Sequence, residues 1–177
     1  ARGLAAAPDD GLQAEMLEAL PGWLADAGLL RYEVSSFARL GHESRHNMAY
    51  WIGAPYLAVG VGAHGFLPQP SALGRRYGNH RNLRDWRAAV LGAELPEALS
   101  ETIEPTMHAD ERLLTGMRLR GGVDVQAWRP WAPPGLVDRL LHAASDMQRQ
   151  GAPLLVEGTR LQVLSHGFIA LDNLVLQ

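Results

Sequence analysis

The sequence predicts an α/β fold that ends in a small winged-helix-like α+β module. Apolar residues at helical spacing alternate with short β-like segments in the first hundred residues, a pattern typical of α/β proteins. After residue 100, helical patterns are followed by a hairpin pattern, which favours a winged-helix-like module. We therefore expect two units, residues 1–100 and residues 101–177.

The first unit is expected to begin with a helix. Its apolar side chains recur at helical spacing and are Leu12, Met16, Leu20, Leu24 and Ala27. Pro21 should kink or restart this helix, because proline has no amide hydrogen to donate, and Gly28 should cap its end. Strands are predicted over residues 31–37 and 56–66, and a further helix over residues 82–91.

The second unit is expected to contain two helices and a hairpin. Thr106 should cap the first helix, which Gly121 and Gly122 end. The second helix follows Pro134 and stops at Gly151.

A hairpin is predicted over residues 154–164, with its turn at Glu157 and Gly158. Ser165 should cap one last helix. The apolar residues of that helix are Phe168, Ile169, Leu171 and Leu174.

Composition excludes several classes of chemistry. The chain has no cysteine, so it cannot form a disulfide or bind zinc or an iron–sulfur cluster through thiolates. All 16 basic residues are arginine, which excludes Schiff-base and P-loop lysines. A net charge of −3 argues against a nucleic-acid partner, and a nucleic-acid-binding C-terminal module is the least favoured of the functions considered.

No apolar run is long enough to span a membrane, and no signal-peptide pattern opens the chain, so a cytoplasmic location is expected. The chain does not begin with Met, which suggests a part of a longer or processed protein.

Positive charge is concentrated in the middle of the chain. Residues 39–87 contain seven arginines against two acidic residues, together with four histidines. Such a segment favours an anionic partner. A basic surface that is simply solvated is the alternative.

A polar and aromatic segment, residues 32–51, follows the first predicted strand, where α/β proteins place ligands. His46 can donate a ring nitrogen to a metal, and Tyr50 and Trp51 offer flat faces to a planar ligand. Arg39 and Arg45 can bind carboxylates. The alternative is that His46 and Asn47 form a structural hydrogen-bonding pair.

A glycine-rich segment, residues 60–65, can approach a ligand closely or adopt positive φ. Its spacing is not that of a dinucleotide-binding motif, and a core-packed turn at a strand end is the alternative. His64 lies between small residues, which favours a positional role over acid–base chemistry. A three-histidine zinc site and a serine hydrolase are both disfavoured, because neither a carboxylate ligand nor a G-x-S-x-G motif accompanies these residues.

Four segments resemble one known family. They are YEVSSFARLGHESRHNMAYW (32–51), YLAVGVGAHG (56–65), RYGNHRNLRDW (76–86) and DERLLTGMRLRGGVD (110–124). Together they resemble the radical SAM proteins related to oxygen-independent coproporphyrinogen III oxidase. The H-N-x-x-Y-W element, residues 46–51, is similar to the haem-chaperone (HemW) branch of that family.

The resemblance implies the C-terminal part of a partial (β/α) barrel in residues 1–100 and a HemN-type C-terminal domain in residues 101–177. The family's [4Fe–4S] cluster and S-adenosylmethionine would then require an upstream half that supplies the cysteines. By position, the resemblance implies S-adenosylmethionine contacts for Ala38, Gly60, Gly62 and His64.

The resemblance also implies haem contacts in the H-N-x-x-Y-W element. It assigns His46 to axial ligation or ligand positioning, and it implies that Arg39 and Arg45 neutralise propionates. The residues implied to contact haem are His46, Asn47, Tyr50, Trp51, Arg45 and Arg39.

The expected function is haem binding and transfer to acceptor proteins, and a homodimer is a further expectation. The alternative is a porphyrinogen oxidase. The chain alone is not expected to be catalytic, because it carries no cluster ligand.

Overall fold

The computed structural model describes residues 8–69 and 72–171. Within these residues the fold is mixed α/β, as predicted, and all paired strands run antiparallel. The helices are α1 (Asp10–Asp26), α2 (Arg45–Trp51), α3 (Leu83–Leu91), α4 (Pro105–Gly116) and α5 (Leu136–Arg149), with 3-10 helices η1 (Val125–Trp128) and η2 (Ser165–Ala170). The strands are β1 (Leu30–Arg31), β2 (Phe37–Ala38), β3 (His64–Gln69), β4 (Ala72–Asn79), β5 (Glu97–Thr102), β6 (Val123–Asp124), β7 (Leu154–Glu157) and β8 (Arg160–Val163).

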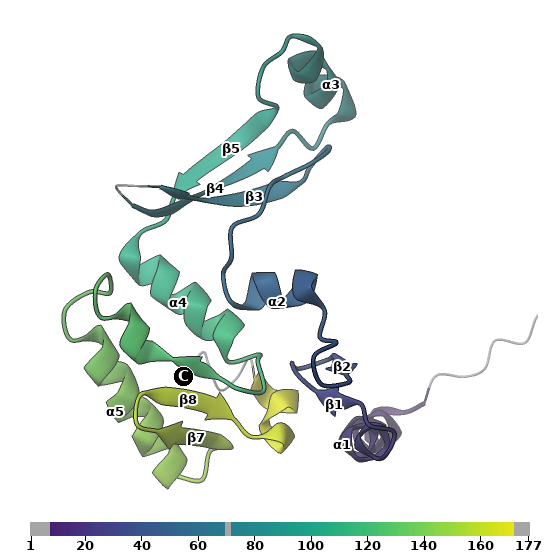
Figure 1. The fold of residues 1–177 in the computed structure, drawn as a ribbon, viewed down its shortest axis with the longest axis vertical. Helices are drawn as coiled ribbons and strands as arrows, with labels where there is room; N and C mark the ends of the chain where they lie inside the picture. Colours follow the sequence, from purple (N-terminus) through teal and green to yellow (C-terminus); the bar gives the residue numbers. More distant parts are fainter. Residues whose placement is uncertain (1–7, 70–71, 172–177) are drawn as a thin grey trace, which may run out of the picture.

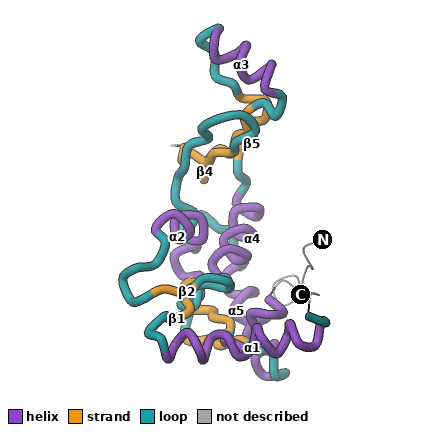
Figure 2. The backbone as a smooth tube through the Cα atoms, turned by 90° about the vertical axis from the view of Figure 1, so that its right-hand side faces the viewer, coloured by secondary structure: helices purple, strands orange, loops and turns teal. Residues whose placement is uncertain are grey.

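The strands form three small sheets, β1-β2, β3-β4-β5 and β6-β8-β7. The β3-β4-β5 sheet and α3 project as an arm from the rest of the molecule (Figure 1). Helix α4 leads from this arm into the C-terminal unit, and α2 lies beside α4 (Figures 1 and 2). This pairing of α2 and α4 positions the candidate site.

Helix α1 differs from its prediction in two ways. The Asp9 side chain caps it by accepting from the backbone nitrogen of Leu12 at 2.9 Å, and the helix then continues through Pro21 without a break. The helix therefore does not restart at Pro21, and the kink expected there stays a prediction. The expected apolar stripe is also not buried, since none of the residues of α1 is buried and Leu12 and Met16 are half exposed.

The strand predicted over residues 31–37 is a hairpin instead. Leu30 pairs with Ala38, and Arg31 pairs with Phe37, so the chain reverses between β1 and β2. The tip of this hairpin pairs with residues that follow α4. The backbone nitrogen of Val34 donates to the carbonyl of Arg118 at 3.0 Å.

The strand predicted over residues 56–66 is also wrong for most of its length. Tyr56 forms one isolated bridge with Phe66, and residues 57–63 form a loop in which Val59 is 86% exposed. Strand β3 starts at His64. Strands β4 and β5 were not predicted, because their residues alternate too irregularly between apolar and polar to indicate a strand.

The C-terminal unit matches its prediction more closely. The long helix ending before Gly151 is α5, as predicted, whereas in the first unit the helix predicted over residues 82–91 is α3. Strands β7 and β8 form the predicted hairpin, with the turn one residue later than expected, at Gly158 and Thr159. Helix α4 begins at Pro105 after Glu104, so Thr106 is not its cap.

The last predicted helix is the 3-10 helix η2, which follows Leu164 without a side-chain cap, so Ser165 is not a cap either. Leu174 lies outside the described residues. The boundary at residues 100 and 101 remains a prediction.

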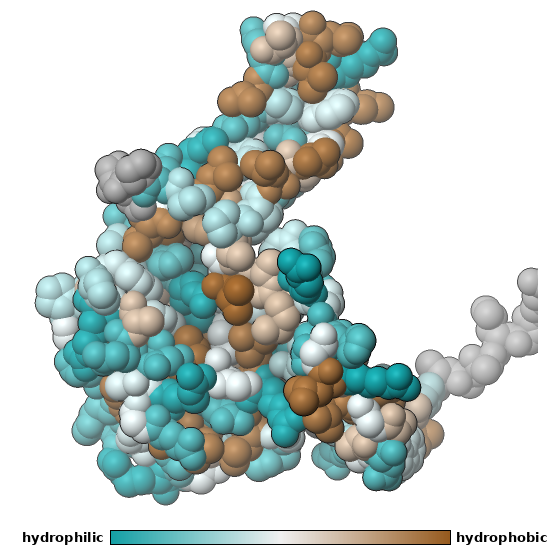
Figure 3. Space-filling model, in the orientation of Figure 1, coloured by the Kyte–Doolittle hydropathy of each residue, from teal (hydrophilic) through white to brown (hydrophobic). Residues whose placement is uncertain are grey.

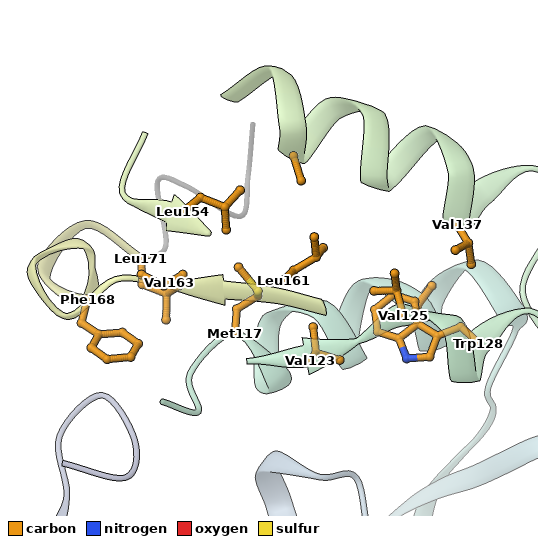
Figure 4. Close-up of a cluster of buried hydrophobic side chains, with 12 residues drawn as sticks. Met117, Val123, Val125, Trp128, Val137, Leu154, Leu161, Val163, Phe168 and Leu171 are labelled. Carbon is orange, nitrogen blue, oxygen red and sulfur yellow. The ribbon is translucent and has the colours of Figure 1, made fainter. Parts of the chain in front are cut away.

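The hydrophobic core lies in the C-terminal unit. Twelve buried side chains between Ala109 and Leu171 form one cluster, contributed by α4, α5, η1, η2 and the β6-β8-β7 sheet (Figure 4). Leu161 on β8 is 1% exposed at the centre of this cluster. Gly122 enters β6 with φ +64°, where a Cβ would lie 2.0 Å from the carbonyl oxygen of Leu161. Only glycine fits this close approach.

Leu161→Ala should destabilise the protein by roughly 2–5 kcal/mol, because it removes buried methyl groups and leaves a cavity. Urea unfolding monitored by circular dichroism measures this change. Leu95→Ala is the matched control, since Leu95 is 77% exposed, and it should change the unfolding free energy by less than about 0.5 kcal/mol. Equal losses in both variants would contradict the placement of the core.

Candidate functional site

The H-N-x-x-Y-W element forms helix α2. Ser44 caps it, with its Oγ accepting from the backbone nitrogen of Asn47 at 3.3 Å. Tyr50 and Trp51 lie three and four residues after Asn47, so both are next to Asn47 on the helix surface. All three line a cavity of about 590 Å³.

The cavity lies against α2, α4, the β1–β2 hairpin and the base of the arm. Its volume falls in the range of small-molecule and cofactor sites. In the space-filling view, hydrophobic residues gather between α4 and α2 (Figure 3). The residues that line it are Glu33, Ser35, Ser36, Asn47, Tyr50, Trp51, Gly53, Tyr56, Phe66, Arg76, His108, Glu111, Arg112, Leu114 and Thr115.

Helix α4 supplies the wall opposite α2, and none of its residues was predicted from the sequence to belong to the site. His108, Glu111, Arg112 and Thr115 all line the cavity, and their spacing of three and four residues places them on one helical face. These four polar residues recur at helical spacing beside the apolar Ala109 and Leu113, and this pattern could have indicated a second polar face in the sequence.

Aromatic rings form a continuous series along one side of the cavity. The His46 ring packs edge-on against Tyr50 at 4.9 Å between ring centroids, and Tyr50 packs against Tyr56 at 4.7 Å. Tyr56 is 6.5 Å from Phe66. Burial is the main cause that raises the pKa of Tyr56, and the nearby Tyr50 adds to it, so its hydroxyl is protonated at neutral pH. These rings provide flat apolar surface with hydroxyl groups at its edge.

The two arginines of the cavity differ in their partners. Arg76 forms ion pairs with Glu101, at 3.4 Å, and with Glu111. Arg112 instead donates from Nη1 to the backbone carbonyl of Trp51 at 3.1 Å. Burial lowers the pKa of Arg112, and no charged group contributes to this shift. Its guanidinium is therefore a half-buried cation with no carboxylate partner among the described residues.

Two buried polar atoms at the cavity wall have no hydrogen-bond partner within residues 8–69 and 72–171, Oε2 of Glu33 and Nε1 of Trp51. Glu33 is 1% exposed, and its Oε1 accepts from the Ser35 hydroxyl at 3.3 Å. Unsatisfied buried polar groups cost free energy, and two further ones, Nε of Arg31 and Nε1 of Trp86, lie outside the cavity lining. The two at the cavity wall support a ligand-binding role for the cavity.

The structure separates the predicted haem-contacting residues into two groups. Asn47, Tyr50 and Trp51 line the cavity. His46 is exposed and reaches the cavity wall only through its contact with Tyr50. Arg39 and Arg45 are exposed and lie outside the cavity lining.

The residues implied to contact S-adenosylmethionine do not line this cavity either. Ala38 lies on β2, and His64 begins β3. Gly60 and Gly62 lie in the loop before β3, which the end of β4 holds in place. The side-chain nitrogen of Asn79 donates to the Gly60 carbonyl at 2.8 Å. A [4Fe–4S] cluster does not fit this chain, because no cysteine is present to ligate it.

Sequence comparisons identify relatives over most of the chain. It is 35% identical over 185 residues to radical S-adenosyl methionine domain-containing protein 1, mitochondrial, of Bos taurus, an alignment that covers 99% of this chain and 41% of the relative. It is 35% identical over 149 residues to the heme chaperone HemW of Mycobacterium tuberculosis, covering 82% of this chain and 37% of that protein. No family model matches the sequence.

A solved structure shares the fold. The coproporphyrinogen III oxidase HemN of Escherichia coli, described as a radical SAM enzyme, superposes with a TM-score of 0.68 at 12% identity. The alignment covers 96% of this chain and 41% of HemN.

The fold and the sequence similarities together define the class as radical SAM-related, and they confirm the resemblance found in the motifs. Within that class, the chain is similar over most of its length to proteins named heme chaperone HemW and radical S-adenosyl methionine domain-containing protein 1. The chain spans about two fifths of the length of the curated relatives it matches.

His108 should titrate below the usual histidine pKa of about 6.5. Burial is the main cause that lowers its pKa, and the positive charge of Arg112 adds to it, partly offset by Glu111. Folding then favours neutral His108, so this contribution to stability is present above about pH 6.5 and is lost as pH falls through the lower folded-state pKa.

NMR titration of the His108 ring protons measures the midpoint, and urea unfolding at a series of pH values measures the stability. His108→Gln should reduce the loss of stability on acidification below about pH 6.5. A His108 midpoint above 6.5 would contradict the burial of this ring.

Proposed function

We propose that this chain forms the haem-binding part of a haem chaperone that transfers haem to acceptor proteins. The observation that carries this proposal is the aromatic cavity between α2 and α4, lined by Asn47, Tyr50 and Trp51 of the H-N-x-x-Y-W element. Relatives that carry the name heme chaperone HemW, found in several bacteria, support the assignment.

The cavity suits a flat, amphipathic ligand. Tyr50, Tyr56 and Phe66 offer ring faces and edges for stacking, and Asn47 offers an amide for hydrogen bonding. His46 lies beside Tyr50 at the exposed end of the aromatic series, where its imidazole is available to the ligand and holds Tyr50 in place. Bound haem would supply an iron centre that accepts a nitrogen or oxygen ligand.

The other parts of the proposal rest on the relatives. S-adenosylmethionine and a [4Fe–4S] cluster belong to the proposed full-length protein, in which another part of the chain supplies the cysteines. A haem acceptor protein, a homodimer and a cytoplasmic location are proposed as well. Three of the matching vertebrate proteins are named mitochondrial, so location differs among relatives. In the described residues, no helix combines the length and the apolar character needed to cross a membrane.

His46→Ala in the full-length protein should weaken haem binding by roughly tenfold, equivalent to about 1.4 kcal/mol. The substitution removes an imidazole beside the cavity and the packing that holds Tyr50. Titration with haem, monitored by the Soret band, measures the affinity.

His42→Ala is the matched control, because His42 is an exposed histidine outside the cavity lining. It should bind haem as the wild type does. Unchanged affinity and an unchanged Soret spectrum in His46→Ala would remove His46 from the site.

The second candidate function is a porphyrinogen oxidase, favoured by the shared fold with coproporphyrinogen III oxidase and by arginines in the cavity. An activity assay of the full-length protein with coproporphyrinogen III separates the two functions. Haem binding without turnover supports the chaperone, whereas turnover supports the oxidase.

A further inference from the structure

The cavity contains a cation that the residues predicted from the sequence do not explain. Arg112 lies in the middle of the polar face of α4, between His108 and Thr115, and all three line the cavity. The arginines expected to bind carboxylates, Arg39 and Arg45, are exposed and lie outside the cavity lining. A carboxylate inside the cavity would therefore meet Arg112 and not these two residues.

The guanidinium of Arg112 is fixed in place at the end of α2. Its Nη1 donates to the Trp51 carbonyl, at the C-terminal turn where a helix has unpaired carbonyls and partial negative charge. Gly53 leaves room for it, because a Cβ at Gly53 would lie 2.6 Å from Nη1. The guanidinium is thus held against the cavity wall before any ligand binds.

Most of its hydrogen-bonding capacity is unused. A guanidinium has five N–H donors, and within the described residues Arg112 makes one hydrogen bond, to Trp51. The other cavity arginine, Arg76, is already paired with two glutamates. A half-buried cation without a carboxylate partner is costly, and an anionic ligand group removes that cost.

The carboxylates near the cavity do not neutralise the positive charge of Arg112. Glu111 pairs with Arg76. The negative charge of Glu33 acts on Arg31, where it opposes the effect of burial on the arginine pKa. By contrast, burial alone accounts for the lowered pKa of Arg112. Among the described residues, no carboxylate therefore forms an ion pair with Arg112.

We infer that Arg112 is the carboxylate-binding residue of the cavity and binds a propionate of the ligand through its unused N–H groups. This inference rests on the proposed haem-binding function. It assigns to α4 the role that the sequence analysis gave to Arg39 and Arg45. Arginine suits the role, because its planar donors match the two oxygens of a carboxylate.

The test compares two ligands in the full-length protein, iron protoporphyrin IX with free propionates and its dimethyl ester. The wild type should bind the free acid about tenfold more tightly than the ester. Arg112→Gln keeps an N–H donor for the Trp51 carbonyl but loses the charge. It should bind the acid about tenfold more weakly than the wild type and leave the ester affinity within about twofold.

Two sets of variants serve as controls. Arg112→Lys keeps the charge and should keep part of the preference for the acid. Arg39→Gln and Arg45→Gln each remove an exposed arginine outside the cavity and should keep the full preference.

Each contrary result has a distinct meaning. Equal binding of acid and ester by the wild type would overturn the inference while leaving haem binding intact. An equal loss for both ligands in Arg112→Gln would assign Arg112 to capping α2 alone and overturn the inference. Loss of the acid preference in the Arg39 or Arg45 variant would move the carboxylate site there. Absence of binding of either ligand by the wild type would overturn both the inference and the proposed function.

Discussion

The site depends on backbone pairing between the tip of the β1–β2 hairpin and the segment that follows α4. Val34 donates to the carbonyl of Arg118, and Arg120 donates to the carbonyl of Tyr32, both at 3.0 Å, around a bridge between Glu33 and Leu119. These bonds join segments about 85 residues apart in sequence. They fix where the chain enters α2 relative to α4, and the cavity lies between these two helices.

This pairing also determines the electrostatics of the cavity wall. It holds the Glu33 side chain almost fully buried, with one carboxylate oxygen bonded to Ser35 and the other without a partner in the described part of the chain. On the other side, the capped helix α2 ends at the guanidinium of Arg112. The cavity thus combines apolar rings with separated positive and negative groups, an arrangement suited to orienting an amphipathic ligand.

The elements that the sequence predicted well are those with a long, one-sided apolar pattern. Helix α5 and the β7–β8 hairpin bury Val137, Ala144, Leu154 and Leu161 in one core, so pattern and packing agree. Strands β4 and β5 lacked such a pattern. Arg75 in β4 pairs with Glu97 in β5, an interaction across the sheet that periodicity along the chain does not reveal.

For the site, the motif identified the α2 wall but not the α4 wall. Asn47, Tyr50 and Trp51 were found because they share a short motif. His108 and Arg112 lie some 60 residues further along the chain, and only the tertiary fold brings them to α2. The exposure of the arginine side chains could not be predicted either, since Arg39 is exposed and Arg112 is partly buried in the cavity wall.

The contact between His108 and Trp131 connects the cavity to the core. The two rings pack edge-on at 4.7 Å, and Trp131 in turn lies 5.8 Å from the buried Trp128. Indole emission depends strongly on neighbouring rings and on solvent. Trp131 is therefore an intrinsic fluorophore at the boundary between the cavity and the folded interior, with no external label required.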